Sequence, residues 1–563
     1  MPTDNYFDAI VLGTGLTEST IAAAISKAGF KVAHLDTNSY YGGHEASLSL
    51  DELAQWADVH SRPDLTAQSN NFSSVTRSET VPPHSRQYSV SLSPSVIPAV
   101  GPFISSLVAS GVSRYGSFKL LERVAIFDGT QIKSVPQSKE DIFQDKTLTL
   151  IYKRRLMRFL MFASGEFELS NELAEKPDVP FFDFLISTFS LSDEIATVIT
   201  FAMAYCNFKT DLTLPALRRV RKLLKSVGRY GPSSFLVGYY GGSGEIAQGF
   251  CRTSAVNRGV YILGKNIATI SQNNGEESEL SRTYKYTVEL DDFPETLYSR
   301  CLISSPYHLS AHLDSITTVS HSTPTSGSTQ PVAFAKCIAI IDKPISFKSS
   351  EHVSAESDEN SSSTSGISEP DTAIIVFPPG SLASGSSNSS AHVLTTGPGT
   401  MTAPAGKCIF LNHLTEMLSD SIVAGIIYIS IPLSSLVDSS PEPLIKPYLD
   451  TVLSMASSKD RKTEPLFLVH YVQHISSPEP SVTPANTSPS LFVTPLLHPD
   501  LTQSCDEAAV AAETIFWNAI RSLESSREGS ERPPDTNVED INTVESFWPS
   551  VGPSDDDESE DGW

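Results

Sequence analysis

Residues 7–43 read FDAIVLGTGLTESTIAAAISKAGFKVAHLDTNSYYGG and contain the clearest structural pattern in the chain. An apolar run over 7–12 ends at a glycine turn, as a buried strand does before a helix. Apolar residues then recur at helical spacing until Gly29, and a second apolar run ends at Asp36. This order predicts a strand, a helix and a parallel strand, the β-α-β opening of an α/β fold that binds dinucleotides.

The glycine turn departs from the usual dinucleotide motif at its last position. Gly13 and Gly15 keep the spacing of G-x-G-x-x-G, but Glu18 replaces the third glycine. In a working site the backbone amides and the helix N-terminus bind a pyrophosphate, and a carboxylate in the first turn repels that anion. Asp36 still stands where a ribose-binding acid is expected. Two interpretations stay open, a flavin or nicotinamide enzyme and a retained fold with a dead cofactor site, and the residues favour the second.

The remaining sequence divides by composition. Helical spacing over 146–231 predicts a small all-α domain, inserted into an α/β domain with mixed sheets that is made of residues 1–145 and 232–475. The Ser-rich stretch 349–390 and the acidic end 525–563 are predicted to be disordered, because such compositions bury too little apolar surface to offset ordering entropy.

Composition and motif searches exclude several classes of function. Asp and Glu number 65 against 40 Lys and Arg, a net charge of −25 that argues against nucleic-acid binding. The six cysteines form no C-x-x-C pair, and no secretory leader pattern opens the chain, so we expect a cytosolic protein. There is no G-x-S-x-G elbow, phosphate loop or metal-spaced histidine pair, so no catalytic residue and no metal ligand is predicted.

Several longer strings resemble one known family. VLGTGLTE (11–18), HLDTNSYYGG (34–43), RYG (229–231) and GEIAQGFCR (244–252) are similar to the Rab GDP-dissociation inhibitors and Rab escort proteins, and the similarity runs with gaps from about residue 6 to about 475. In that family a flavoprotein-like fold persists without flavin, and a glutamate at the place of Glu18 is part of the family pattern. The resemblance therefore implies a GDI-like, FAD-binding-like fold with no cofactor.

The resemblance also implies a function. Insertions and the Phe-Cys-Arg triplet that ends at Arg252 favour the escort branch. Escort proteins bind GDP-bound Rab GTPases, present them to the α/β heterodimer of Rab geranylgeranyltransferase, inhibit GDP dissociation, and deliver the Rab with its geranylgeranyl lipid to membranes, which they contact transiently. They are non-catalytic accessory subunits. A recycling GDP-dissociation inhibitor and an FAD-dependent oxidoreductase remain the alternatives.

Family positions imply four groups of site residues. The Rab-binding platform matches Tyr41, Arg86, Glu245, Arg252, Tyr261 and Ile262, and the region that holds the Rab C-terminus matches Arg229 and Phe235. Candidates for prenyltransferase docking are Phe159, Phe162 and Arg158, with the choice of phenylalanine left open. Candidates for lipid binding are Leu156, Leu160, Ile195, Ile199 and Met203.

Each group has a structural alternative. Glu245 and Arg252 are seven residues apart and would share one face of a helix, where an internal ion pair is the alternative to a partner-binding role. Phe235 and the five lipid-binding candidates can also be ordinary core residues.

Overall fold

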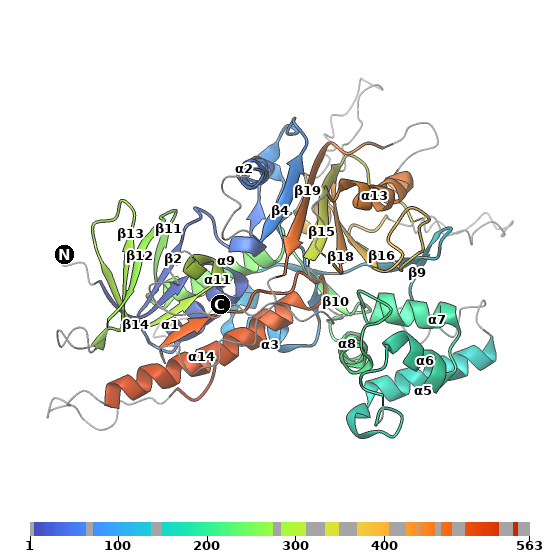
Figure 1. The fold of residues 1–563 in the computed structure, drawn as a ribbon, viewed down its shortest axis with the longest axis horizontal. Helices are drawn as coiled ribbons and strands as arrows, with labels where there is room; N and C mark the ends of the chain where they lie inside the picture. Colours follow the sequence, from blue (N-terminus) through green and yellow to red (C-terminus); the bar gives the residue numbers. More distant parts are fainter. Residues whose placement is uncertain are drawn as a thin grey trace, which may run out of the picture.

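A computed structural model describes residues 5–62, 71–136, 149–174, 176–273, 283–310, 333–347, 369–404, 424–435, 440–456, 463–475, 490–528 and 544–549. Figure 1 shows two β-sheets side by side, a group of helices beyond the second sheet, and a long C-terminal helix that runs beneath the first. The predicted disorder of 349–368, 529–543 and 550–563 lies outside the described residues.

The first sheet contains the predicted β-α-β opening, which is confirmed. β1 (Tyr6–Leu12) pairs in parallel with β2 (Val32–Asp36), and α1 (Leu16–Lys27) connects them. The strand order is β11-β2-β1-β14-β13-β12, with β20 pairing β14. The added strands are β11 (Val260–Leu263), β12 (Ile267–Gln272), β13 (Tyr286–Leu290), β14 (Leu297–Ser304) and β20 (Leu491–Val493).

The second sheet has the order β4-β19-β15-β18-β17-β16-β8-β9. Helix α2 (Leu50–His60) packs on β4, and α13 (Glu442–Ala456) packs on β15 and β18. The strands are β4 (Phe72–Arg77), β8 (Arg123–Phe127), β9 (Ile132–Ser134), β15 (Ala333–Ile341), β16 (Ala373–Phe377), β17 (Ala391–Thr396), β18 (Gly425–Leu433) and β19 (Phe467–His474).

The prediction of disorder over 349–390 is wrong for its second half. Every residue of β16 is buried, and the strand pairs with β8 and β17. The run AIIVF is fully apolar, so it fills both faces of a central strand. The prediction rested on the average composition of a Ser-rich stretch, in which a run of five apolar residues has little weight.

Short elements link the two sheets. The helices among them are α3 (Pro102–Ser110), α9 (Ser243–Val256) and α11 (Pro306–Ser310), with single turns η1 (Gly43–Glu45), η3 (Ser85–Gln87), η4 (Val112–Arg114) and η7 (Pro398–Thr400), whereas the turn η5 (Phe167–Leu169) belongs to the helical group. The small sheets are β6 (Ile97–Pro98) with β10 (Phe235–Gly238) and β7 (Phe118–Leu120), and β3 (Ser47–Leu48) with β5 (Val90–Ser91).

The helical group lies below the second sheet in Figure 1. It consists of α5 (Leu150–Ser164), α6 (Phe181–Phe189), α7 (Asp193–Thr197), a π-helical continuation η6 (Val198–Met203) and α8 (Thr213–Ser226). Its aromatic side chains form one continuous core with one face of the second sheet. The helices and that sheet therefore share a single apolar interior.

A C-terminal helix joins the helical group to the first sheet. α14 (Ser504–Glu528) packs on α1 and α3. In its first turn, Asp506 accepts a hydrogen bond from the backbone N–H of Phe103 at 3.1 Å and lies 2.7 Å from the Lys222 ammonium on α8. One carboxylate thus contacts both parts of the molecule.

The predicted boundaries at the C-terminal end are also wrong in part. β20 and α14 extend the α/β part beyond residue 475. Within the acidic end 525–563, Phe547 is buried and its ring packs against Phe516 and Trp548. Isolated aromatic residues in a polar tail can bury themselves in this way, and composition averages conceal them.

Two kinds of feature are absent from the described residues. No helix there is both long and apolar enough to span a membrane. No group of three or more His, Cys, Asp and Glu side chains there could hold a metal ion.

Candidate functional site

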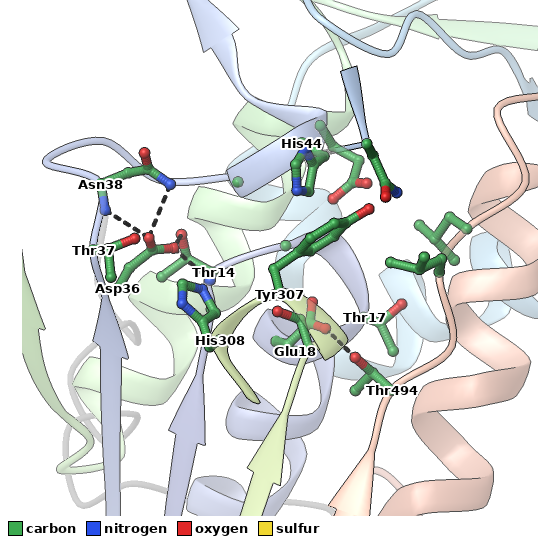
Figure 2. A pocket seen from close by; sticks show the side chains of 18 of the residues that line it. Thr14, Thr17, Glu18, Asp36, Thr37, Asn38, His44, Tyr307, His308 and Thr494 are labelled. Carbon is green, nitrogen blue, oxygen red and sulfur yellow. Dashed lines mark hydrogen bonds between the residues drawn. The ribbon is translucent and has the colours of Figure 1, made fainter. Parts of the chain in front are cut away.

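The glycine turn between β1 and α1 borders a cavity of about 400 Å³ (Figure 2). Gly13 has a φ of +97°, a conformation that glycine adopts without strain. Glu18 lies in the first turn of α1, is buried, and accepts a hydrogen bond from the hydroxyl group of Thr494. A carboxyl group of the chain itself therefore lies at the start of the helix.

A second carboxyl group reaches the same helix start. The backbone N–H of Leu16 donates to Glu45 Oε2 at 3.1 Å. A Cβ atom on Gly15 would lie 2.5 Å from Glu18 Oε2 and 3.0 Å from Glu45 Oε2. The two carboxyl groups therefore meet over the bare Cα of Gly15, which explains why a glycine is needed there. Sequence reasoning missed Glu45, because no local pattern links it to the turn.

Burial changes the protonation of this carboxyl pair. Burial raises the pKa of Glu18 to about 7, although the Thr494 hydrogen bond acts against the change. Burial, and then the charge of Glu18, raise the pKa of Glu45 to about 8. A bound pyrophosphate would face both groups in a partly dry site. The residues present do not fit a dinucleotide at the start of α1, while the absence of flavin stays a prediction.

Both carboxylate oxygens of Asp36 already accept hydrogen bonds from other residues of the chain. Its Oδ2 atom accepts hydrogen bonds from the Thr14 backbone N–H at 2.7 Å and the Thr14 hydroxyl at 2.6 Å. Its Oδ1 atom accepts from the backbone N–H and the side-chain amide of Asn38 at 2.8 and 3.0 Å (Figure 2). Both oxygens therefore connect the end of β2 to neighbouring loops. An acid that binds a ribose would instead need an oxygen that is free to accept a hydrogen bond from the ribose hydroxyl group.

Four of the six predicted platform residues meet in a second hollow, which we call the α9 groove. Tyr41, Glu245, Arg252 and Tyr261 line it, and its volume is about 290 Å³. The rings of Tyr41 and Tyr261 meet edge to face, with centroids 5.9 Å apart. Glu245 and Arg252 share one face of α9, as predicted, and no ion pair among the described residues joins them. The internal ion pair that was the alternative is therefore wrong for this structure.

Tyr115 also lines the α9 groove, and sequence reasoning missed it. Its ring is half exposed, and the Arg252 guanidinium carbon lies 4.6 Å from the ring centroid. Such a cation–π contact holds a long side chain in one orientation. The position follows η4, and only the fold shows that this turn packs against α9.

The other two predicted platform residues lie outside the α9 groove. Arg86 is exposed on η3, which packs on α2. Ile262 follows Tyr261 on β11 and packs against the apolar core of the first sheet, because successive side chains on a strand point to opposite faces.

A third, mostly apolar cavity of about 240 Å³ lies between the helical group and the second sheet. Of the five lipid-binding candidates, Leu160 and Met203 line it. The other three, Leu156, Ile195 and Ile199, are core residues outside its wall. Further wall residues include Met157, Met161, Leu223, Leu224 and Phe235.

The structure separates the remaining candidates by exposure. Phe159 is fully buried against Phe181 and Phe189. Phe162 is half buried, and Arg158 is exposed beside it, with its guanidinium carbon 5.5 Å from the Phe189 ring centroid. Only Phe162 and Arg158 are therefore available to a partner without unfolding.

The two candidates for the Rab C-terminus also differ. Arg229 is exposed at the end of α8, with its guanidinium over Tyr230. Phe235 is buried in the wall of the apolar cavity, where its ring meets Tyr205 edge to face. Phe235 therefore belongs with the apolar cavity and not with an exposed surface.

The arrangement defines a flavoprotein-like α/β fold in which carboxyl groups line the position where a dinucleotide would bind. Comparison with solved structures agrees with this class. Rab GDI from Plasmodium falciparum aligns with a TM-score of 0.59 at 18% identity, covering 91% of this chain and 98% of that one. An oxidoreductase from Methanosarcina mazei aligns with a TM-score of 0.53 at 14% identity, covering 91% and 100%. The predicted FAD-binding-like, GDI-like fold is confirmed.

Sequence comparison identifies the family. The family model described as GDP dissociation inhibitor matches residues 3–291, which is more than half of the 563 residues, so the chain belongs to this family. Rab proteins geranylgeranyltransferase component A from Drosophila melanogaster is 34% identical over 321 residues, which cover 53% of this chain and 59% of the fly protein. The chain spans about half the length of the curated relatives that it matches.

Proposed function

We propose that the chain escorts Rab GTPases. It binds a GDP-bound Rab, slows GDP release, presents the Rab to the α/β heterodimer of a Rab geranylgeranyltransferase, and carries the lipidated product to a membrane. In this role the chain is a cytosolic accessory subunit that holds no flavin and catalyses no step. The observation that carries the proposal is the α9 groove, where four predicted platform residues lie together.

The chemistry of the α9 groove suits a protein partner. Arg252 is exposed and supported by the Tyr115 ring, so its fork of N–H donors is free for a carboxylate or for backbone oxygens. Tyrosine and arginine are also the residue types that dominate binding energy at protein interfaces. Preference for the GDP form is then a difference between the affinities for two switch conformations.

The apolar cavity supports the lipid-carrying part of the proposal. Burial of a prenyl chain contributes about 0.8 kcal/mol per CH₂ group, so a carrier needs an apolar recess. Met161 lies at the edge of the cavity and is exposed, and Met157 lies about one turn earlier on the same face of α5. Methionine side chains adapt easily to a flexible chain.

Two observations favour an escort over a recycling inhibitor. The fly relative is named as a component of a geranylgeranyltransferase. Phe162 and Arg158 present an aromatic and a cationic side chain on the outer part of α5, where a transferase subunit could dock. The recycling inhibitor remains the second candidate, because the Plasmodium structure that shares the fold carries that name.

The deciding experiment mixes the chain with a GDP-bound Rab and the transferase heterodimer and measures complex mass by analytical ultracentrifugation. A ternary complex is expected. Phe162→Ala is expected to keep the Rab complex and to lose the transferase. Leu169→Ala, at an exposed apolar residue of the same helical group, is the matched control and should keep both.

A Rab complex that never recruits the transferase would favour the inhibitor. Failure to bind Rab would reject both candidates. Phe159→Ala serves as a folding reference, because removing a buried phenylalanine costs about 3–5 kcal/mol of stability.

A further inference from the structure

The cavity at the start of α1 has no role in the proposed Rab binding, although its volume of about 400 Å³ is within the range of small-molecule sites. Its walls come from the β1–α1 turn, the end of β2, η1, α11 and the segment after β20. Figure 2 shows the Tyr307 ring near its centre, between His44 and Glu18. The surroundings are polar enough to hold a ligand that forms hydrogen bonds.

The charged side chains in this wall are carboxyl groups. Glu18, Asp36 and Glu45 line the cavity, and no lysine or arginine is among the described residues that do so. Burial lowers the pKa of His44 to about 3 and lowers that of His308, so both imidazoles are neutral. The wall therefore offers a cation several carboxyl oxygens and offers an anion no cationic side chain.

The Glu18–Glu45 pair has no cationic partner. Neither carboxyl group forms an ion pair among the described residues. Lys336, whose charge acts on Glu45, is buried outside the cavity wall, and burial lowers its pKa to about 7. The raised pKa values of Glu18 and Glu45 mean that the pair retains protons near neutral pH, and an ammonium group between the two carboxyl groups would favour their ionised form without displacing an existing ion pair.

Two buried polar atoms in the same wall also lack hydrogen-bond partners. Thr17 is 2% exposed and Gln473 is 7% exposed, and both line the cavity. Neither the Thr17 hydroxyl nor the Gln473 Oε1 atom has a hydrogen-bond partner within the described structure. Buried polar atoms are rarely left unsatisfied, and an amide oxygen can only accept, so this wall is suited to a ligand that carries N–H donors.

We propose that this cavity binds a small organic cation, an aliphatic amine whose ammonium group lies between Glu18 and Glu45 and whose other donors reach Gln473. In dinucleotide-binding proteins of this fold class, the same region binds an anionic pyrophosphate. The proposed site would bind a cation there. A metal ion is a poorer match, because the described residues offer no group of three ligands there and the cavity far exceeds the size of an ion.

Isothermal titration calorimetry with three probes tests the proposal. 1,5-Diaminopentane is expected to bind at one site, whereas 1,5-pentanediol, which has the same length without the charges, should bind at least about tenfold more weakly. ADP, an anionic probe, should give no measurable binding. Equal binding of the diol and the diamine, tighter binding of ADP, or no heat with any probe would overturn the proposal.

Variants locate the site. Glu18→Gln and Glu45→Gln should each weaken diamine binding by more than about tenfold, and Gln473→Leu by a smaller factor. Glu513→Gln, at an exposed residue of α14, is the matched control and should bind as the wild type does. Circular dichroism melting confirms that each variant is folded. Diamine binding that survives in the folded Glu18→Gln and Glu45→Gln variants would also overturn the proposal.

The same variants separate this inference from the Rab-binding proposal. All four should bind GDP-bound Rab with wild-type affinity, because none of the altered residues lines the α9 groove. Loss of Rab binding in the three cavity variants, with Glu513→Gln still binding Rab, would mean that the cavity belongs to the Rab site and would reject an independent amine site. A chain that binds Rab but no amine would leave the escort proposal intact and reject this one.

Discussion

The cavity at the start of α1 and the α9 groove lie on two helices that pack against each other, yet their charged side chains differ in exposure to solvent. In the cavity, Glu18 is buried and Glu45 is partly buried, and desolvation raises the pKa of both. In the groove, Arg252 is exposed and held over an aromatic ring. The comparison shows that solvent exposure, more than residue type, distinguishes a charged side chain that interacts only within the chain from one that can bind a partner.

The largest expected effect tests the buried side of this comparison. The pKa of Glu18 rises from 4.5 in an unfolded chain to about 7 in the fold. Between these two values the unfolded chain loses this proton first, so wild-type stability falls as the pH rises. Glu18→Gln cannot ionise at this position and escapes this loss. The difference between its free energy of unfolding and that of the wild type should therefore shift in favour of the variant by about 3 kcal/mol when the pH is raised from about 4.5 to 8.

Urea denaturation at the two pH values measures this difference in the free energy of unfolding. Glu513→Gln, with its exposed side chain, should show no such trend. A Glu18→Gln variant whose advantage is the same at both pH values would show that Glu18 is not buried as an acid.

The next effect tests the exposed side. Arg252→Ala should weaken Rab binding by more than about tenfold, or about 1.4 kcal/mol, because it removes the exposed guanidinium of the α9 groove. Thermal stability should change little, since Arg252 forms no ion pair among the described residues. Titration of a labelled Rab gives the affinity, with Lys225→Ala as an exposed cationic control on α8. Unchanged affinity in a folded variant would remove Arg252 from the interface.

The smallest effect concerns the ring that supports this arginine. Tyr115→Ala should weaken Rab binding by about fivefold, and Tyr115→Phe should keep most of the affinity, because the cation–π contact needs the ring and not the hydroxyl group. The same Rab titration measures both variants. A phenylalanine variant as weak as the alanine variant would show that the hydroxyl group, and not the ring, matters.

The sequence predicted those parts of the site that are local. The β-α-β opening, the carboxylate of Glu18 in the first helical turn and the place of Asp36 all follow from one continuous stretch, because strand and helix periodicities and turn glycines act over a few residues. The shared face of Glu245 and Arg252 followed from helical spacing in the same way.

The rest depends on contacts between distant segments. Thr494 reaches Glu18 across 476 positions of the sequence, and Glu45 joins the same helix start from a separate turn. Whether a phenylalanine of α5 is exposed depends on how α6 packs, so the choice between Phe159 and Phe162 needed the fold. The assignment of Phe235 to the apolar cavity needed it for the same reason.

The late position of β20 and α14 in the chain has a consequence for synthesis. Ala22 and Ile25 of α1 are covered by Phe516 and Ala519 of α14, which the ribosome adds nearly 500 residues later. At about 5–20 residues per second the apolar face of α1 waits roughly half a minute or more for its cover. The nascent chain is therefore expected to depend on a chaperone during this interval.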